Sequence, residues 1–480
     1  MAAVLVLAAC FAPGARANWL APVTVSAPHD QIDDLQLTSG APGDLVSWNY
    51  WDLIRGKGTF TTPGSGYALA PAGGAFGAER RLAPSNANAA MVDLGAGRLA
   101  RLMLMPSGAN TSRPMVVLGG VAGDFGSPMS IPGASVFVGR ASLAGNARGE
   151  LLLAWIAADR NGGQRTVWAS VRAPGGHFGR PRLISGGEDP EQVSAAAGPQ
   201  GDLVIAFPSK RGRMLARVRR HGRRWGALEN LGAGARGSEN DVTPFVGADG
   251  RVVLAWYDTQ LCEGGCESPG FTRVAVKPPG ASRFRPARLL ERDPLGLTGA
   301  PSGTSLAPIV LSVHGQAPMV LFLGAAATPS GLPPVSSAVV EAAYPSGLGF
   351  AAPQSISATD QLASDIAAAA SPSGAIVTWI SEQPPGYDSG NVFAATRLPT
   401  TGRFGPPEQI SPSEHVLSAL PTFNLSGHWP QNSPPWSVAW ASRPEGEEAH
   451  TVVRVSSPLC EAPAPPLSAT VVADPMCSGA

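Results

Sequence analysis

Apolar residues along this chain occur in short runs bounded by glycine or proline, and helical periodicity is hard to find. A run of four to eight apolar residues between turn signals is typical of a β-strand that is buried on both faces. Eight runs approximate the pattern Gly-x-apolar-apolar-x-Ala-Trp: GDLVSW (43–48), GELLLAW (149–155), GDLVIAF (201–207), GRVVLAW (250–256), GAIVTW (374–379), PWSVAW (435–440), PMVLFL (318–323) and GRLARLML (97–104). The sequence therefore predicts an all-β fold with eight buried strands.

Each run is followed by a strand of alternating polarity, such as TVWASVRA (166–173), and each run but the last is then followed by an aromatic-led closing strand. The closing strands approximate F-G-x-P-x-x-I-S, as in HFGRPRLIS (177–185) and RFGPPEQIS (403–411). A repeat of about fifty residues with about four strands is typical of one blade of a β-propeller. We predict an eight-bladed β-propeller; the alternative is a seven-bladed ring with residues 83–130 as an insertion.

The first closing strand, NWLAPVTVS (18–26), precedes every core run, and the last core run has no closing strand after it. An open ring would leave an unpaired strand edge, which is a liability in sheet proteins. We therefore predict that residues 18–26 complete the last blade and close the ring. Burial of Trp19, Val23 and Val25 would then contribute about 1.5 to 3 kcal/mol each.

Residues 1–17 combine a short apolar run with the ending Ala15-Arg16-Ala17, which predicts a signal peptide. The alternative is a lipobox, Leu7-Ala8-Ala9-Cys10, which would place a lipid on Cys10 and hold the protein at a membrane. Both interpretations predict a secreted, extracellular or cell-surface protein. Residues 18–457 are then one propeller domain, and residues 458–480 are a C-terminal tail.

The four cysteines after the leader are an even number in a chain expected to be exported, which predicts two local disulfides. The pairs are Cys262 with Cys266 and Cys460 with Cys477. A zinc site is the alternative for these thiols, but no histidine lies at finger spacing near either pair. We expect no metal and no cofactor, and a quinone-dependent dehydrogenase is disfavoured because no tryptophan-docking repeat is recognisable.

Formal net charge is zero, with 35 basic and 35 acidic residues, so no global field attracts nucleic acid or an anionic membrane. One segment, KRGRMLARVRRHGRRW (210–225), is strongly basic. It either binds a polyanion or forms the solvated outer face of one blade. We expect a monomer that binds a carbohydrate or protein ligand.

The longest connections follow the core runs and should emerge on one face of the ring, where binding loops on a rigid scaffold are favoured. Carboxylates that lead into the innermost strands can hydrogen-bond sugar hydroxyls, and aromatic residues of the long loops can stack on sugar rings. Both residue types also have structural roles in turns and in loop packing. The candidate ligand-binding residues are Asp33, Glu191, Asp241, Asp365, Trp51, Tyr257, Asp258, Tyr387 and Asp388.

The GxLVxAW runs and the F-G-x-P-x-x-I-S closing strands resemble the sialidase-like superfamily of β-propellers, which includes secreted bacterial repeat proteins. Enzymes of that superfamily carry Asp boxes and an arginine triad, but SPSGAIVTW (371–379) matches a box only at Thr378 and Trp379. We therefore predict no catalytic residue and expect a non-catalytic propeller that recognises a glycan or protein through its loop-rich face. The alternative is a glycoside hydrolase or lyase that uses carboxylates at the axial opening.

Overall fold

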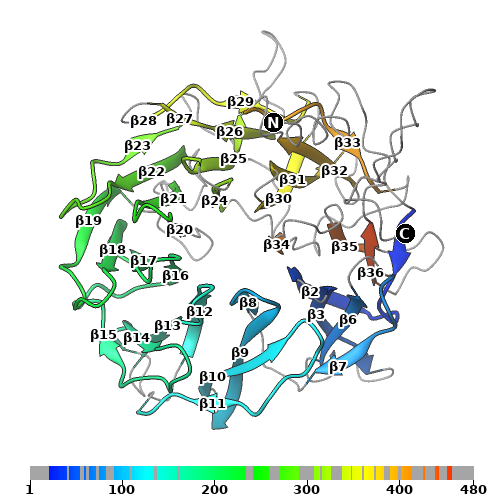
Figure 1. The fold of residues 1–480 in the computed structure, drawn as a ribbon, viewed down its shortest axis with the longest axis horizontal. Helices are drawn as coiled ribbons and strands as arrows, with labels where there is room; N and C mark the ends of the chain where they lie inside the picture. The colour runs from blue at the N-terminus through cyan, green and yellow to red at the C-terminus, as the bar shows by residue number, and fades with distance from the viewer. Residues whose placement is uncertain are drawn as a thin grey trace, which may run out of the picture.

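The computed structural model of the chain is a ring of β-sheets around a central axis, and its described residues contain no helix (Figure 1). Accordingly, this part of the chain has no apolar helix of membrane-spanning length. The structure describes residues 21–40, 43–54, 59–60, 64–71, 75–82, 91–108, 111–133, 138–158, 163–233, 242–258, 271–290, 307–313, 316–325, 338–346, 349–358, 362–371, 374–382, 390–397, 402–411, 425–427, 438–442 and 451–456.

Eight of the sheets are blades, and in the first seven blades the strands run from the axis outward in chain order. Blades one to four consist of β2 (Gln31–Gly40), β3 (Gly43–Trp51), β6 (Gly64–Pro71) and β7 (Arg80–Leu82); β8 (Met91–Asp93), β9 (Arg98–Gly108), β10 (Thr111–Gly120) and β11 (Met129–Ser130); β12 (Val138–Gly145), β13 (Leu151–Ala157), β14 (Thr166–Arg172) and β15 (Arg182–Leu183); and β16 (Ser194–Ala197), β17 (Leu203–Ser209), β18 (Arg213–Arg219) and β19 (Glu229–Ala233).

Blades five to seven repeat this order, and blade eight has three paired strands. They consist of β20 (Val242–Val246), β21 (Val252–Asp258), β22 (Phe271–Lys277) and β23 (Arg288–Leu289); β24 (Ile309–Leu311), β25 (Met319–Ala325), β26 (Ala338–Ala343) and β29 (Gln354–Ser355); β30 (Leu362–Ser371), β31 (Gly374–Glu382), β32 (Gly390–Arg397) and β33 (Glu408–Gln409); and β35 (Val438–Ser442), β36 (Val452–Ser456) and β1 (Val23–Thr24).

Three additional pairings lie outside this scheme. Two are short hairpins, and one adds a parallel strand to the inner edge of blade one. They are β4 (Leu53–Ile54) with β5 (Thr59–Phe60), β27 (Pro345–Ser346) with β28 (Gly349–Phe350), and β34 (Leu425–Gly427) with β2.

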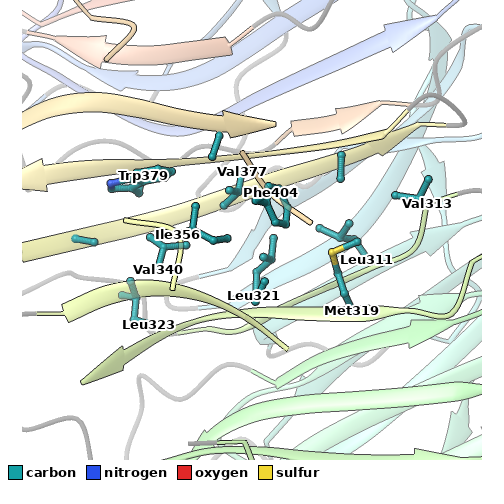
Figure 2. Packing of buried hydrophobic residues seen from close by; sticks show 14 of the residues in the cluster. Leu311, Val313, Met319, Leu321, Leu323, Val340, Ile356, Val377, Trp379 and Phe404 are labelled. Atoms are coloured by element: carbon teal, nitrogen blue, oxygen red, sulfur yellow. The ribbon is translucent and has the colours of Figure 1, made fainter. Parts of the chain in front are cut away.

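The apolar runs form the second strand of blades one to seven and strand β35 of blade eight, which confirms the eight-bladed prediction. The weakest run forms β9, so residues 91–130 are a blade and not an insertion. Strands β13, β17 and β21 are buried along their whole length because neighbouring blades cover both of their faces. In Figure 2, for example, Leu321 of blade six packs in one cluster with Val377 and Phe404 of blade seven.

The closing strands repeat two hydrogen bonds to the third strand of their blade. In blade three, the amide of Ile184 donates to the carbonyl of Val167 at 2.8 Å, and the hydroxyl of Ser185 accepts from the amide of Val167 at 2.8 Å. The corresponding serines of blades six and seven, Ser357 and Ser411, accept from the same position of their third strands at 2.9 Å. The final Ile-Ser of the sequence pattern therefore supplies hydrogen-bond partners for the backbone of the third strand.

The N-terminal strand makes the same contacts in blade eight. Strand β1 pairs antiparallel with β36, with Thr24 opposite Arg454. The amide of Val25 donates to the carbonyl of Val453 at 2.9 Å, and Ser26 Oγ accepts from the amide of Val453 at 2.7 Å. Figure 1 shows this blue strand beside the red β36. The prediction that the N-terminal strand closes the ring is confirmed.

The predicted burial of the N-terminal strand is confirmed at one position and wrong at another. Val25 is only 4% exposed, whereas Val23 is 50% exposed because it lies at the outer rim of an edge strand that no further strand covers. Trp19 lies outside the described residues.

His29 fastens the segment after this strand to blade one. The imidazole stacks on the ring of Tyr50, with 3.8 Å between centroids. Its Nδ1 lies 3.0 Å from Asp52 Oδ1, and its Nε2 lies 3.3 Å from Glu79 Oε2. Burial lowers the pKa of His29, but the hydrogen bonds and charges of the Glu79 and Asp52 carboxylates outweigh this effect and raise its pKa overall. The imidazole therefore links blade one to the segment that pairs with Thr451 of blade eight.

Candidate functional site

The carboxylates predicted to surround the axial opening belong to separate blades. Asp33 lies on β2 and Asp365 on β30, each at a shift in strand register, and Asp365 has a φ of 47° and is buried. A bulge of this kind redirects side chains. Glu191 precedes β16, and its Oε2 is buried without a hydrogen-bond partner in the described part of the chain. Asp241 lies outside the described residues.

The predicted aromatic and acidic residues of the long loops are partly continuations of the second strands. Trp51 ends β3 and is half-buried. Tyr257 and Asp258 end β21 and are each 2% exposed. Tyr257 packs in the core cluster between blades six and seven, and Asp258 forms an ion pair with Arg273. Tyr387 and Asp388, like the four cysteines, lie outside the described residues.

No described group of three His, Cys, Asp or Glu residues could hold a metal ion. Among the described residues, Tyr257 and Asp258 are neighbours on β21, and Asp33 and Trp51 lie on the paired strands β2 and β3 of blade one; Glu191 and Asp365 belong to other blades. The long connections at 259–270, 326–337 and 383–389 also lie outside the described residues, so the loop-rich face stays a predicted binding surface.

A cavity of about 390 Å³ lies on the opposite face, between the short turns of blades six and seven. Its walls come from two turns of blade six, β24–β25 and β26–β29, and from the β32–β33 turn of blade seven. The residues that supply polar or charged groups are Gln316, Tyr344, Gln354, Arg397 and Arg403. Its described lining residues supply two guanidinium groups and no carboxylate.

Arg397 is the most buried of these polar residues, with 7% of its surface exposed. It is the last residue of β32, and its Nε donates to the carbonyl of Gly402 at 3.0 Å, across the turn. The guanidinium carbon lies 5.5 Å from the centre of the Tyr344 ring, within cation–π range. Its Nη1 is buried and has no hydrogen-bond partner among the described residues.

Tyr344 and Gln354 form the blade-six wall of the cavity. Tyr344 Oη lies 2.8 Å from Gln354 Oε1, and Gln354 Nε2 donates to the carbonyl of Phe404 at 2.9 Å. Burial raises the pKa of Tyr344, while the Phe404 backbone, the charge and side-chain hydrogen bonding of Arg397, and the charge of Arg403 act in the opposite direction. The phenol is therefore neutral at physiological pH, and the wall carries no negative charge.

The junction of blades four and five contains the same arrangement with one decisive difference. Lys277 ends the third strand of blade five as Arg397 ends that of blade seven, and it donates to the turn carbonyl of Ser282 at 2.8 Å. Glu229 occupies the position of Gln354: its Oε2 accepts from the amide of Phe284 at 2.8 Å, as Gln354 Oε1 accepts from the amide of Phe404 at 3.3 Å.

At that junction, however, Glu229 Oε1 also lies 2.6 Å from Lys277 Nζ, so the buried cation has a carboxylate partner. At the junction of blades six and seven an amide, Gln354, occupies the position of that carboxylate, and no carboxylate of the described residues pairs with Arg397. A buried guanidinium next to a neutral wall favours an anion from outside the chain, because an unpaired buried charge is costly. The site can therefore bind a carboxylate, sulfate or phosphate group.

Sequence reasoning missed this site because its face has short turns and because cations recur at the end of third strands. Arg172, Arg219, Lys277 and Arg397 all occupy that position. The available signal was the exchange of glutamate for glutamine between two closing strands, LEN (228–230) and PQS (353–355).

Comparisons with known proteins support no assignment beyond the propeller fold. No protein-family model and no curated protein matches the chain. Among solved structures, it is similar to the BP39L lectin of Burkholderia pseudomallei (14% identity over 79% of this chain and 100% of the lectin, TM-score 0.46). It is also similar to an ulvan lyase of polysaccharide lyase family PL25 (9% identity over 76% of this chain and 90% of the lyase, TM-score 0.42). A third similar structure is a prolyl endopeptidase (17% identity over 87% of this chain, TM-score 0.45). The chain spans about half, 54%, of that endopeptidase.

Proposed function

We propose that this protein is a non-catalytic binding propeller that recognises an acidic group of a glycan or protein ligand in the cavity between blades six and seven. The observation that carries the proposal is Arg397, a buried cation whose repeat-equivalent neighbour is Gln354 instead of the glutamate found at blades four and five. A guanidinium fork matches the geometry of a carboxylate or sulfate. A cavity of this size accommodates one sugar residue or one amino-acid side chain.

The test uses a variant that the protein itself suggests. Gln354→Glu places a carboxylate at the position that corresponds to Glu229, which already pairs with Lys277 at the junction of blades four and five. The variant should therefore fold, and its new carboxylate should form an ion pair with Arg397 and compete with an external anion. Isothermal titration with acetate, sulfate, galacturonate and glutamate, each beside a neutral analogue, measures anion binding. We expect saturable binding of at least one anion by the native protein and at least tenfold weaker binding by Gln354→Glu, equivalent to about 1.4 kcal/mol.

A matched control is Arg182→Ala, which removes one exposed arginine from β15 on blade three. It should leave the affinity unchanged, because Arg182 occupies the equivalent closing-strand position of another blade. If the native protein binds none of the anions, or if Gln354→Glu binds them as well as the native protein does, the proposed function is wrong.

The proposal also includes three predictions that come from the sequence alone. They are export of the chain, membership of the sialidase-like superfamily, and ligand contacts by the loop-rich face. The competing prediction, glycoside hydrolysis or lysis by carboxylates at the axial opening, is distinguished by turnover. Release of reducing ends from an acidic oligosaccharide, lost on Glu191→Gln, would favour the enzyme, whereas binding without turnover favours the binding protein.

A further inference from the structure

A second cavity, of about 110 Å³, lies in the neighbouring groove between blades five and six on the same short-turn face. Pro345 lines both cavities, so only the outer turn of blade six separates them. The β24–β25 and β26–β29 turns of blade six therefore separate the two grooves.

The second cavity repeats the charge of the first. Arg251 and Arg285 line it, and its described lining residues include no carboxylate. Arg288 approaches the same groove, because its Nη1 lies 2.7 Å from the position that a Cβ on Gly349 would occupy. Arg251 has an ion-pair partner, Asp249, at 3.5 Å, but both side chains are partly exposed and such a pair contributes little. The two grooves together form a cationic track across blades five to seven.

We propose that this track binds a linear acidic polysaccharide, with one anionic sugar at Arg397 and another at Arg285. The inference rests on the proposed function and extends it from one anionic group to a chain of them. Two linked sites raise the affinity of a divalent ligand because the second group binds at a high effective concentration. Residues between the anionic groups would cross from one groove to the other at Pro345, where the exposed amide of Gln316 can accept or donate a hydrogen bond to hydroxyls.

The lining favours a polysaccharide over nucleic acid. Single-stranded nucleic acids bind on exposed aromatic platforms. The described aromatic residues of the two grooves are Tyr344, whose ring lies against Arg397, and Phe350, which packs against the core cluster between blades five and six. These contacts occupy the two rings in packing, whereas carboxylated sugars can bind to guanidinium and amide donors.

The experiment measures how the affinity for an acidic oligosaccharide depends on its length, in the native protein and in variants. Galacturonate and its di-, tri- and hexasaccharides are titrated into the native protein, Arg397→Ala, Arg285→Ala and the control Arg182→Ala. We expect affinity to rise at least tenfold between the monosaccharide and the longest oligosaccharide. Arg285→Ala should lose that gain in affinity while binding the monosaccharide as the native protein does. Arg397→Ala should bind both the monosaccharide and the oligosaccharide more weakly. Arg182→Ala should match the native protein.

The outcomes separate this inference from the proposed function. If Arg285→Ala keeps the full gain with chain length, the track is refuted while the Arg397 site stands. If Gln354→Glu and Arg397→Ala both bind every ligand normally, the proposed function fails and the track fails with it. Competition by single-stranded polyadenylate or poly-glutamate as strong as that of the hexasaccharide would refute the assignment to polysaccharide.

Discussion

The hydroxyl of Ser26 offers a local test of how the ring is closed. It accepts a hydrogen bond from the amide of Val453 at 2.7 Å, and Val453 is fully buried. Ser26→Ala removes the acceptor and leaves a buried N–H without a partner, which costs about 1 to 3 kcal/mol. Ser411→Ala makes the same change in blade seven, where the distance to Val392 is 2.9 Å, so both variants should lose similar stability.

Urea denaturation of the native protein and the two variants measures this cost, provided the slope with denaturant is unchanged. Hydrogen exchange at the amide of Val453 gives a second readout, because the lost acceptor should speed exchange there and in β1. The reasoning is refuted if Ser411→Ala is destabilised by the expected amount while Ser26→Ala behaves like the native protein. That result would mean that the N-terminal strand contributes nothing to the folded ring.

Three further outcomes follow from named contacts. Because the pKa of His29 is raised, its contribution to stability is complete below its unfolded value of about 6.5 and is lost as pH rises through the folded value; thermal melting should show this loss, and His29→Gln should flatten it. Glu229→Gln should lower the unfolding free energy by about 3 to 5 kcal/mol by leaving buried Lys277 unpaired, and a denaturation midpoint equal to the native one would contradict this. Gly250→Ala should be destabilising by more than about 1 kcal/mol, because its φ is 79°, whereas Gly77→Ala lacks that constraint and should cost less.

The propeller could be predicted from the sequence because its signals are local and repeated. Continuous apolar runs predicted strands covered on both faces, and β13, β17 and β21 are buried throughout. The closing pattern ending in Ile-Ser predicted a strand whose backbone and hydroxyl contacts are the same in blades three, six and seven. Because the N-terminal segment carries a close variant of that pattern, ending in Val25-Ser26, its place in blade eight followed from the sequence.

The binding residues were harder to predict because they depend on contacts between blades. Tyr257 follows a buried run directly, and the strand continues through it into the core instead of ending before it. Arg397 looks like other cations at the end of third strands, and its distinctive feature is the amide of Gln354 on the preceding blade. No periodicity of a single strand reports which residues of two blades will meet.

The most direct test of ring closure is a cross-link between the two ends of the propeller. Thr24 and Arg454 lie opposite each other in an antiparallel pair, where Cα atoms are about 4.5 to 5.5 Å apart and a disulfide can form. In Thr24→Cys with Arg454→Cys, mild oxidation should join the two new thiols, as peptide mapping without reductant would show, and should raise the melting temperature. The control pair, Thr24→Cys with Leu183→Cys on blade three, should stay reduced. Equal cross-linking of both pairs, or none in the first, would contradict a ring closed by its N-terminal strand.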